Sequence, residues 1–274
     1  MRAIALINQK GGVGKTTCTA NLGAALASHG KRVLMVDIDP QANLSVHYGI
    51  KVYQIPTSIY FLLVGQATLN QTIMKTMVDG LDIIPSNIDL AGAEIELVGM
   101  PGREMILKEA MNGVETRYDY LLVDCPPSLG LLTLNALTTV SEIFIPLQTE
   151  FFALQGMSKL LETFEIVKKR LNHSLEITGI IPCMFDARTR LSQEVLENIR
   201  EYFENKVFKS IIRKNVKLAE APSHGKPINV YAADSHGAAD FMALAKEVIA
   251  QENSKGPTPI VQTDACMPAP TVTG

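Results

Sequence analysis

Short apolar runs alternate with longer amphipathic segments along most of this 274-residue chain. The runs are rich in Val, Ile and Leu and are continuous, without the alternation of apolar and polar residues that a half-exposed strand shows. Continuous runs of this kind are typical of strands covered on both faces of a parallel sheet. They predict strands at residues 3–7, 32–37, 81–84, 120–124, 143–147 and 177–181, and a short piece at residues 207–208.

The intervening segments have the length and periodicity of helices. In one of them, Val195, Ile199 and Phe203 recur at four-residue spacing, which puts them on one helix face. The alternation of strands and helices predicts an α/β fold with a doubly wound, mostly parallel sheet and helices on both faces. The pattern predicts helices at residues 15–29, 154–171, 191–204 and 237–251.

Composition is that of an ordinary globular protein. Hydrophobic residues make up 47% and charged residues 19%, which excludes a collagen-like, coiled-coil or wholly disordered chain. The chain shows neither the features of a signal peptide nor an apolar run long enough to cross a bilayer, and its four cysteines lack metal-ligand spacing. We therefore expect a cytoplasmic protein with one domain over residues 1–252 and a disordered, Pro- and Thr-rich tail over residues 253–274.

A glycine-rich segment separates the first predicted strand from the first predicted helix. Glycines let backbone N–H groups point inward, and the helix N-terminus adds the positive end of its dipole, so the segment predicts a phosphate site. Gln9 stands where the strict P-loop motif has its first glycine, and Lys10 is an additional lysine. Lys15 is expected to reach the β- and γ-phosphates and Thr16 to coordinate Mg²⁺. The segment consists of Lys10, Gly11, Gly12, Val13, Gly14, Lys15, Thr16 and Thr17.

Two carboxylates follow predicted strands. Asp39 lies after the strand at residues 32–37, and Asp124 ends the strand at residues 120–124. The carboxyl ends of parallel strands line the ligand crevice of a doubly wound sheet. One such carboxylate can hold Mg²⁺, often through water, and a second can orient the water that attacks the γ-phosphate. Thr16, Asp39 and Asp124 are therefore the candidate magnesium ligands.

These motifs resemble those of one ATPase group. Residues 10–17 with their extra lysine, residues 36–41 and residues 124–127 together resemble the deviant Walker A ATPases. Within that group the chain resembles the ParA/Soj partition proteins, over roughly residues 1–250. The resemblance implies a P-loop NTPase fold, Mg²⁺-dependent hydrolysis of ATP to ADP and phosphate, and a role in chromosome or plasmid partition.

The resemblance also implies roles for single residues. ATP would bind between the two subunits of a homodimer, with Lys10 reaching the partner's phosphates and Lys15 acting within its own subunit. Asp124 would support Mg²⁺, and Asp39 would position the hydrolytic water. By this resemblance, Lys10, Lys15, Asp39 and Asp124 are the candidate catalytic residues.

The same resemblance places the rest of the nucleotide. Glu150 is a candidate for a contact across the dimer near the ribose. Adenine would lie near Met184 and against the turn from Arg213 to Asn215. The family usually has Pro at position 213, where this chain has Arg.

The distribution of charge changes what the total suggests. The chain has 25 Lys and Arg against 28 Asp and Glu, a net −3 that by itself argues against nucleic-acid binding. Residues 151–217, however, carry +4, which leaves −7 for the remainder. By the family resemblance, residues in this region bind double-stranded DNA without sequence specificity. The candidates are Arg188, Arg190, Lys214 and Lys217.

The resemblance further implies nucleoid association, no membrane partner, and a ParB-type centromere-binding protein that stimulates hydrolysis. Three other functions stay open. A MinD-like ATPase that cycles on membranes to place the division site needs a basic amphipathic C-terminal helix, which residues 237–251 do not offer. An iron–sulfur carrier needs paired thiolates, and Cys125 has no second cysteine nearby in the sequence. A scaffold with an inactive ATP site would have no use for Asp39, Asp124 and Thr16.

Overall fold

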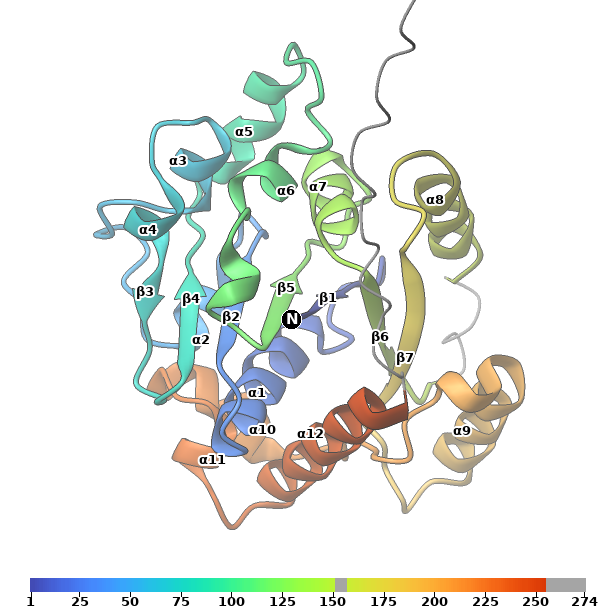
Figure 1. Cartoon of the computed structure of the whole chain (residues 1–274). Helices are drawn as coiled ribbons and strands as arrows, with labels where there is room; N and C mark the ends of the chain where they lie inside the picture. The colour runs from blue at the N-terminus through green and yellow to red at the C-terminus, as the bar shows by residue number, and fades with distance from the viewer. Residues whose placement is uncertain (151–156, 255–274) are drawn as a thin grey trace, which may run out of the picture.

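The computed structural model describes residues 1–150 and 157–254 (Figure 1). Its strands are β1 (Arg2–Leu6), β2 (Val33–Asp37), β3 (Met74–Lys75), β4 (Leu81–Ile84), β5 (Tyr120–Asp124), β6 (Glu142–Gln148) and β7 (Glu176–Cys183). The α-helices are α1 (Lys15–Ser28), α2 (Asn43–His47), α3 (Ile59–Leu63), α4 (Leu69–Thr72), α5 (Leu90–Leu97), α6 (Ile106–Ala110), α7 (Leu131–Thr139), α8 (Met157–Arg170), α9 (Arg190–Phe203), α10 (Val216–Glu220), α11 (Ile228–Tyr231) and α12 (His236–Ser254). Short 3₁₀ turns lie at Val114–Thr116, Glu204–Lys206 and Ala221–His224.

The described strands form a single sheet in the order β3-β4-β2-β5-β1-β6-β7. Every neighbouring pair is parallel except β3 with β4, which is antiparallel. The chain starts in the middle of the sheet, moves to one edge and then crosses to the other. This confirms the doubly wound, mostly parallel α/β sheet predicted from the apolar runs.

Alternate residues of the central strands enter two separate cores. In β1, Ala3 and Ala5 face a core completed by α3, α5, α6, α7, α8 and α9, whereas Ile4 and Leu6 face a core completed by α1 and α12. Helices therefore cover both faces of the sheet, as Figure 1 shows, and continuous apolar strands follow from that double burial. Over residues 1–150 and 157–254, no helix combines the length and apolar character needed to cross a membrane.

Strand register brings the chemically important residues to one edge of the sheet. Asp124 at the end of β5 pairs with Leu6 at the end of β1 on one side and with Asp37 at the end of β2 on the other. The glycine-rich loop follows β1 directly, and Asp39 follows β2. The loop and the carboxylates therefore converge where a doubly wound sheet binds its ligands.

The sequence pattern failed at the weakest elements. Residues 207–208 do not form a strand: Val207 makes only an isolated parallel bridge to Ile180. The antiparallel edge strand β3 was not predicted, because two residues carry no readable period. The short helices from α2 to α7 were also missed. For the predicted helix at 154–171, the structure gives Met157–Arg170, and residues 154–156 lie outside the described residues, as do residues 255–274 of the predicted tail.

Gly179 in β7 lies at a very tight contact. The rings of Phe144 and Phe208 meet edge to face, with centroids 5.1 Å apart, and both are fully buried against this glycine. A Cβ atom at position 179 would lie 2.6 Å from Cδ1 of Phe144 and closer still to the ring of Phe208. Neither ring has room to retreat, because interiors are close-packed.

Replacing Gly179 by Ala should therefore destabilise the fold. We expect Gly179→Ala to lower the free energy of unfolding by about 1–3 kcal/mol in urea denaturation, the usual effect of overpacking a core. The matched control is Gly99→Ala, because an added Cβ there meets no atom within 4 Å and the backbone does not require glycine. The control should change stability by less than about 0.5 kcal/mol, and equal effects of the two variants would contradict the packing argument.

Candidate functional site

The loop between β1 and α1 has the backbone of an anion cradle. Gly12 and Gly14 have φ angles of 74° and 97°, in the left-handed region that favours glycine. Gly14 is the N-terminal capping position of α1, and no side chain caps the helix there. The first N–H groups of α1 thus have no side-chain acceptor and can bind an anion, helped by the helix dipole.

The two lysines of the loop have different surroundings. Lys15 is only 7% exposed, and its Nζ donates to the carbonyl oxygen of Lys10 at 3.4 Å. Burial lowers the pKa of Lys15, and the negative charges of Asp124 and Asp39 oppose that effect. Lys10 is exposed, and its Nζ lies 3.3 Å from Oε2 of Glu150 in an ion pair open to solvent. Such exposed pairs contribute little, so Lys10 can exchange this partner at low cost.

Asp124 faces the start of α1. Its Oδ2 accepts a hydrogen bond from the hydroxyl of Thr16 at 2.7 Å, and its Oδ1 accepts one from Thr19 at 3.2 Å. The carboxylate is fully buried, and desolvation followed by the charge of Asp37 raises its pKa to about 8. The positive charge near the Asp124 carboxylate is therefore too small to offset its burial and the repulsion from Asp37.

The loop after β2 is organised by Asp37, to which the sequence analysis gave no role. Oδ2 of Asp37 accepts hydrogen bonds from the backbone N–H and the hydroxyl of Ser45, at 2.8 and 2.7 Å. Oδ1 accepts from the backbone N–H of Asp39 at 3.2 Å. Desolvation raises the pKa of Asp37 to about 7. Asp37 thus fixes the loop that carries Asp39, whose own Oδ1 accepts from the N–H of Gln41 at 2.9 Å.

The donor set fits Mg²⁺ bound together with phosphates. Among the described residues, no group of three or more His, Cys, Asp or Glu could hold a metal alone. Mg²⁺ is usually bound through one or two protein oxygens, with phosphate and water completing the octahedron. The Thr16 hydroxyl and the buried Asp124 carboxylate already touch, and the charge of Lys15 does not offset the desolvation of that carboxylate. These are suitable oxygens for that role.

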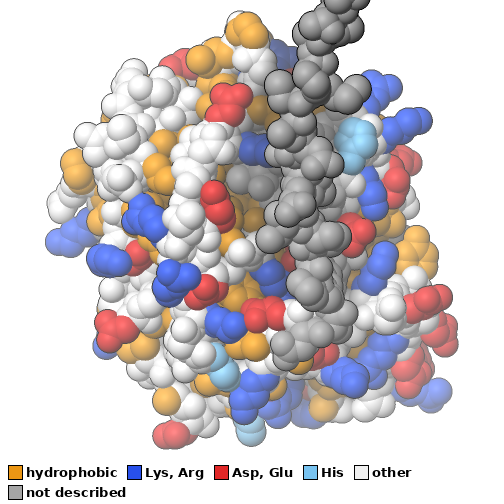
Figure 2. Space-filling model, viewed as in Figure 1, with side chains coloured by type: hydrophobic (Ala, Val, Ile, Leu, Met, Phe, Trp, Pro, Cys, Tyr) orange, Lys and Arg blue, Asp and Glu red, His pale blue; other side chains and the backbone are white. Residues whose placement is uncertain are grey.

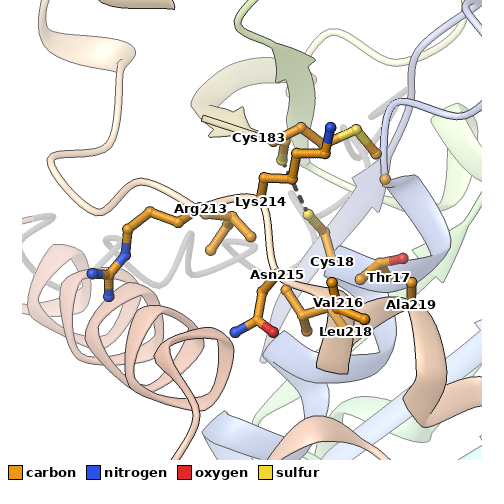
Figure 3. A pocket seen from close by; sticks show the side chains of 12 residues that line it. Thr17, Cys18, Cys183, Arg213, Lys214, Asn215, Val216, Leu218 and Ala219 are labelled. Atoms are coloured by element: carbon orange, nitrogen blue, oxygen red, sulfur yellow. Dashed lines mark hydrogen bonds between the residues drawn. The ribbon is translucent and has the colours of Figure 1, made fainter. Parts of the chain in front are cut away.

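Two adjoining cavities flank the loop. One, of about 450 Å³, is bordered by the loop together with Asp39, His47 and Pro127. The other, of about 330 Å³, is lined largely by apolar atoms and is shown in Figure 3. Gly14, Thr17 and Met184 border both cavities. A polar cavity at the phosphate loop joined to an apolar one suits a molecule with a phosphate end and an aromatic end.

The residues predicted to hold adenine border the apolar cavity, but they face it differently. Met184 follows β7 with a φ of 54° and borders both cavities. The guanidinium group of Arg213 points away from the cavity and bonds to Asp240 of α12 (Figure 3). The side chain of Asn215 accepts a hydrogen bond from the N–H of Lys217 at 2.8 Å and so caps α10.

The predicted DNA contacts are exposed, but most are paired with acidic side chains. Arg188 bonds to Asp186 at 2.7 Å, Arg190 to Glu194 at 2.9 Å and Lys217 to Glu220 at 2.9 Å. Lys214 is exposed and forms no ion pair among the described residues. Figure 2 shows this mixture, with Lys and Arg beside Asp and Glu around the position of α9. The charge count over residues 151–217 could not reveal these pairs, because a sum does not show which side chains meet, and Glu220 lies outside that range.

His47 is a second residue at the site that the sequence analysis did not single out. Its ring is 1% exposed at the border of the phosphate cavity, and its Nε2 has no hydrogen-bond partner among the residues that the structure describes. Burial lowers its pKa to about 4, so the ring is neutral at pH 7. A lone His in a sequence gives no signal of this setting, since it depends on the loop at Lys226 packing over α2.

The fold and the phosphate loop together define a P-loop ATPase. A family model described as an AAA domain matches residues 1–177. The chain is 52% identical over 249 residues to the sporulation initiation inhibitor protein Soj of Bacillus subtilis, covering 91% of this chain and 98% of that protein. It is 48% identical over 254 residues to the chromosome-partitioning ATPase Soj of Treponema pallidum, covering 93% and 99%. The chain belongs to the ParA/Soj family of chromosome-partitioning ATPases.

A solved structure supports the nucleotide chemistry of this fold. The chain resembles the crystal structure of cobyrinic acid a,c-diamide synthase from Mycobacterium smegmatis with bound ATP analog and magnesium. The TM-score is 0.82 at 35% identity, covering 93% of this chain and 96% of that one. The predicted family, the fold class and the ATPase activity are thereby confirmed, while the roles of single residues stay predictions.

The two buried carboxylates predict how stability depends on pH. Because the folded-state pKa values of Asp37 and Asp124 lie at about 7 and 8, the folded protein holds protons there that the unfolded chain has lost. The free energy of unfolding of the nucleotide-free protein should therefore fall as pH rises from 6.5 to 8.5. His47 acts only below this window, where acid destabilises the fold by charging its ring. Thermal denaturation across the range measures the slope.

Asp124→Asn should flatten this dependence, because it removes one of the two titrating groups. Asp79→Asn is the matched control, since Asp79 is exposed and lies away from the site. A wild-type slope in Asp124→Asn, or a stability that rises with pH, would contradict the assignment of the buried charges.

Proposed function

We propose that this chain partitions DNA as an ATP-dependent dimer. The ATP-bound form pairs two copies around two nucleotides, binds double-stranded DNA without regard to sequence, and lets go after hydrolysis. A ParB-type protein on a centromere-like site stimulates that hydrolysis, and the ATPase is associated with the nucleoid in the cytoplasm. Membership of the chromosome-partitioning family supports the general role, and the site supports the cycle.

The observation that carries this proposal is the contrast between the two loop lysines. Lys15 is buried beside Asp124 and Asp39, as expected of a residue that serves its own subunit's phosphates. Lys10 is exposed, and among the described residues its ammonium group has only the exposed Glu150 as a partner. A second lysine at the mouth of a phosphate site is well placed for phosphates that a partner subunit brings. Glu150, released from Lys10, is then free to contact the partner near the ribose.

The same arrangement accounts for dimerisation that depends on ATP. Two ATP anions facing one another repel unless cations lie between them, and Lys10 and Lys15 of each subunit supply that charge. Mg²⁺, held by Thr16 and Asp124 with Asp39 nearby, supplies further positive charge to the phosphates. Hydrolysis and phosphate release remove anions that the lysines hold, so the pair loosens.

Hydrolysis itself requires an oriented water. Asp39 lies in the loop that Asp37 fixes, is 8% exposed and borders the phosphate cavity. A carboxylate held there can accept a hydrogen bond from the attacking water and direct it at the γ-phosphate. Adenine occupies the apolar cavity, against Met184 and the backbone from Arg213 to Asn215.

Removing Asp39 should separate assembly from hydrolysis. We expect Asp39→Ala to lose at least about 100-fold in ATP turnover, because the water is no longer oriented, and to accumulate as a dimer with ATP. Light scattering with and without ATP measures the mass. Asp39→Ala combined with Lys10→Ala should bind ATP yet stay monomeric, since the partner's phosphates lose their cation. An Asp39→Ala protein that remains monomeric with ATP would contradict this cycle.

The DNA contacts can be tested by reversing charge. We expect the Arg188→Glu, Lys217→Glu double variant to bind duplex DNA at least about tenfold more weakly with ATP at low salt, and to show a shallower salt dependence. The control is Lys108→Glu with Arg117→Glu, an equal charge change at two exposed positions, one in α6 and one directly after the 3₁₀ turn at Val114–Thr116. Equal binding by the two double variants would show that affinity follows total charge and not this surface.

A further inference from the structure

Two cysteines meet beside the phosphate loop. Cys18 and Cys183 are 165 residues apart in the sequence, and their Sγ atoms lie 3.5 Å apart. Cys18 belongs to the first turn of α1, and Cys183 is the last residue of β7. Both are free thiols and almost fully buried. A disulfide needs about 2.05 Å between the sulfurs, so closing it requires a movement of roughly 1.5 Å.

The pair lies on the wall of the apolar cavity. Both cysteines line it together with Asn215 and Val216, as Figure 3 shows, and Met184 lines it as well. A Cβ added to Gly14 would lie 4.0 Å from Sγ of Cys183, so the thiols also adjoin the phosphate loop. The cavity is therefore both the proposed adenine site and the path by which a small reagent reaches the sulfurs.

Cys125 provides an internal comparison. It is 1% exposed, as Cys18 is, but its Sγ has the carbonyl oxygen of Val123 at 3.9 Å as its partner, and it lines neither cavity. Within residues 1–150 and 157–254, a thiol in contact with another thiol occurs only at Cys18 and Cys183. Burial alone therefore does not distinguish Cys18 and Cys183 from Cys125. What distinguishes them is the contact between their two thiols and their position on the cavity wall.

We propose that Cys18 and Cys183 form an oxidation site for peroxides, and that a bound nucleotide protects it by filling the cavity. One thiol attacks hydrogen peroxide, which forms an S–O bond, breaks the O–O bond and releases water. The second thiol displaces the hydroxyl of that sulfenic acid as a second water. Overall, two thiols lose two electrons to form one disulfide, and one peroxide is reduced to two waters.

The disulfide would tie the start of α1 to the end of β7. Thr17 and Met184, which border both cavities, are the chain neighbours of the two cysteines. The nucleotide-free state, whose cavity is open, is thus the form that oxidation would capture. This inference uses the nucleotide cavity of the proposed function but neither the dimer nor DNA.

The test is to oxidise the full-length protein with hydrogen peroxide, with and without saturating Mg²⁺-ADP, and to map disulfides by mass spectrometry. The time course should extend over hours, because the hydrogen bond between the thiols, followed by burial, raises the pKa of Cys18 and slows its reaction. We expect one linked peptide joining Cys18 to Cys183, reversed by dithiothreitol. Mg²⁺-ADP should slow its formation at least fivefold.

Matched variants identify the thiols. Cys125→Ser and Cys266→Ser should form the linked peptide at the wild-type rate, whereas Cys18→Ser and Cys183→Ser should not form it. Absence of the peptide from wild type, or cross-links through Cys125 or Cys266 instead, would overturn the site. Titration with a fluorescent ADP analogue is run alongside. If ADP binds but does not slow oxidation, nucleotide protection is wrong; if ADP does not bind, the nucleotide site fails, and the peptide still tests the thiol pair.

Discussion

The structure depends on the forced proximity of two carboxylates at the ends of adjacent parallel strands. The register that pairs β2 with β5 sets Asp37 directly opposite Asp124, and helices cover both faces of the sheet, so neither group can turn to water. Desolvation and mutual repulsion raise the pKa of Asp124. The pairing of β5 with β1 on its other side places the loop after β1 beside Asp124. The fold thus creates a site in which the negative charge of two buried carboxylates is not fully balanced by positive charge.

The two carboxylates have different roles: Asp37 holds the loop after β2, and Asp124 is available to a cation. Both carboxylate oxygens of Asp37 accept hydrogen bonds, from Ser45 and from the N–H of Asp39. Asp37 therefore shapes the loop and has few lone pairs left to bind a ligand. Within the described part of the chain, the Asp124 carboxylate bonds only to the hydroxyl groups of Thr16 and Thr19, and hydroxyls can rotate toward another acceptor. A cation arriving with a nucleotide would relieve the repulsion at Asp124 without disturbing the loop. Binding and stability are therefore coupled through one residue.

Much of this could be predicted from the sequence, because the strong signals are local. Continuous apolar runs gave the six longer strands, and the glycine and lysine pattern located the phosphate loop on its strand and helix. What could not be predicted depends on tertiary contacts. The role of Asp37 requires the position of Ser45, and the setting of His47 requires the loop at Lys226. The contact between Cys18 and Cys183 joins elements 165 residues apart, which no spacing rule connects.

The basic residues show most clearly why an inference from local sequence has to be checked against the structure. Residues 206–217 contain basic side chains and no acid, yet Arg213 bonds to Asp240 and Lys217 to Glu220. DNA phosphates would have to compete with these carboxylates, so one copy offers few cations that are free of such partners. Exposed ion pairs are weak and exchange partners readily, and a polyanion contacts many of them together. A dimer presents twice as many exchangeable cations to one duplex as a single chain does. Because the contributions of the two chains to the DNA binding constant multiply, dimerisation should raise the affinity by much more than twofold. That coupling would allow ATP, by pairing two chains, to control attachment to DNA without moving any of the basic residues.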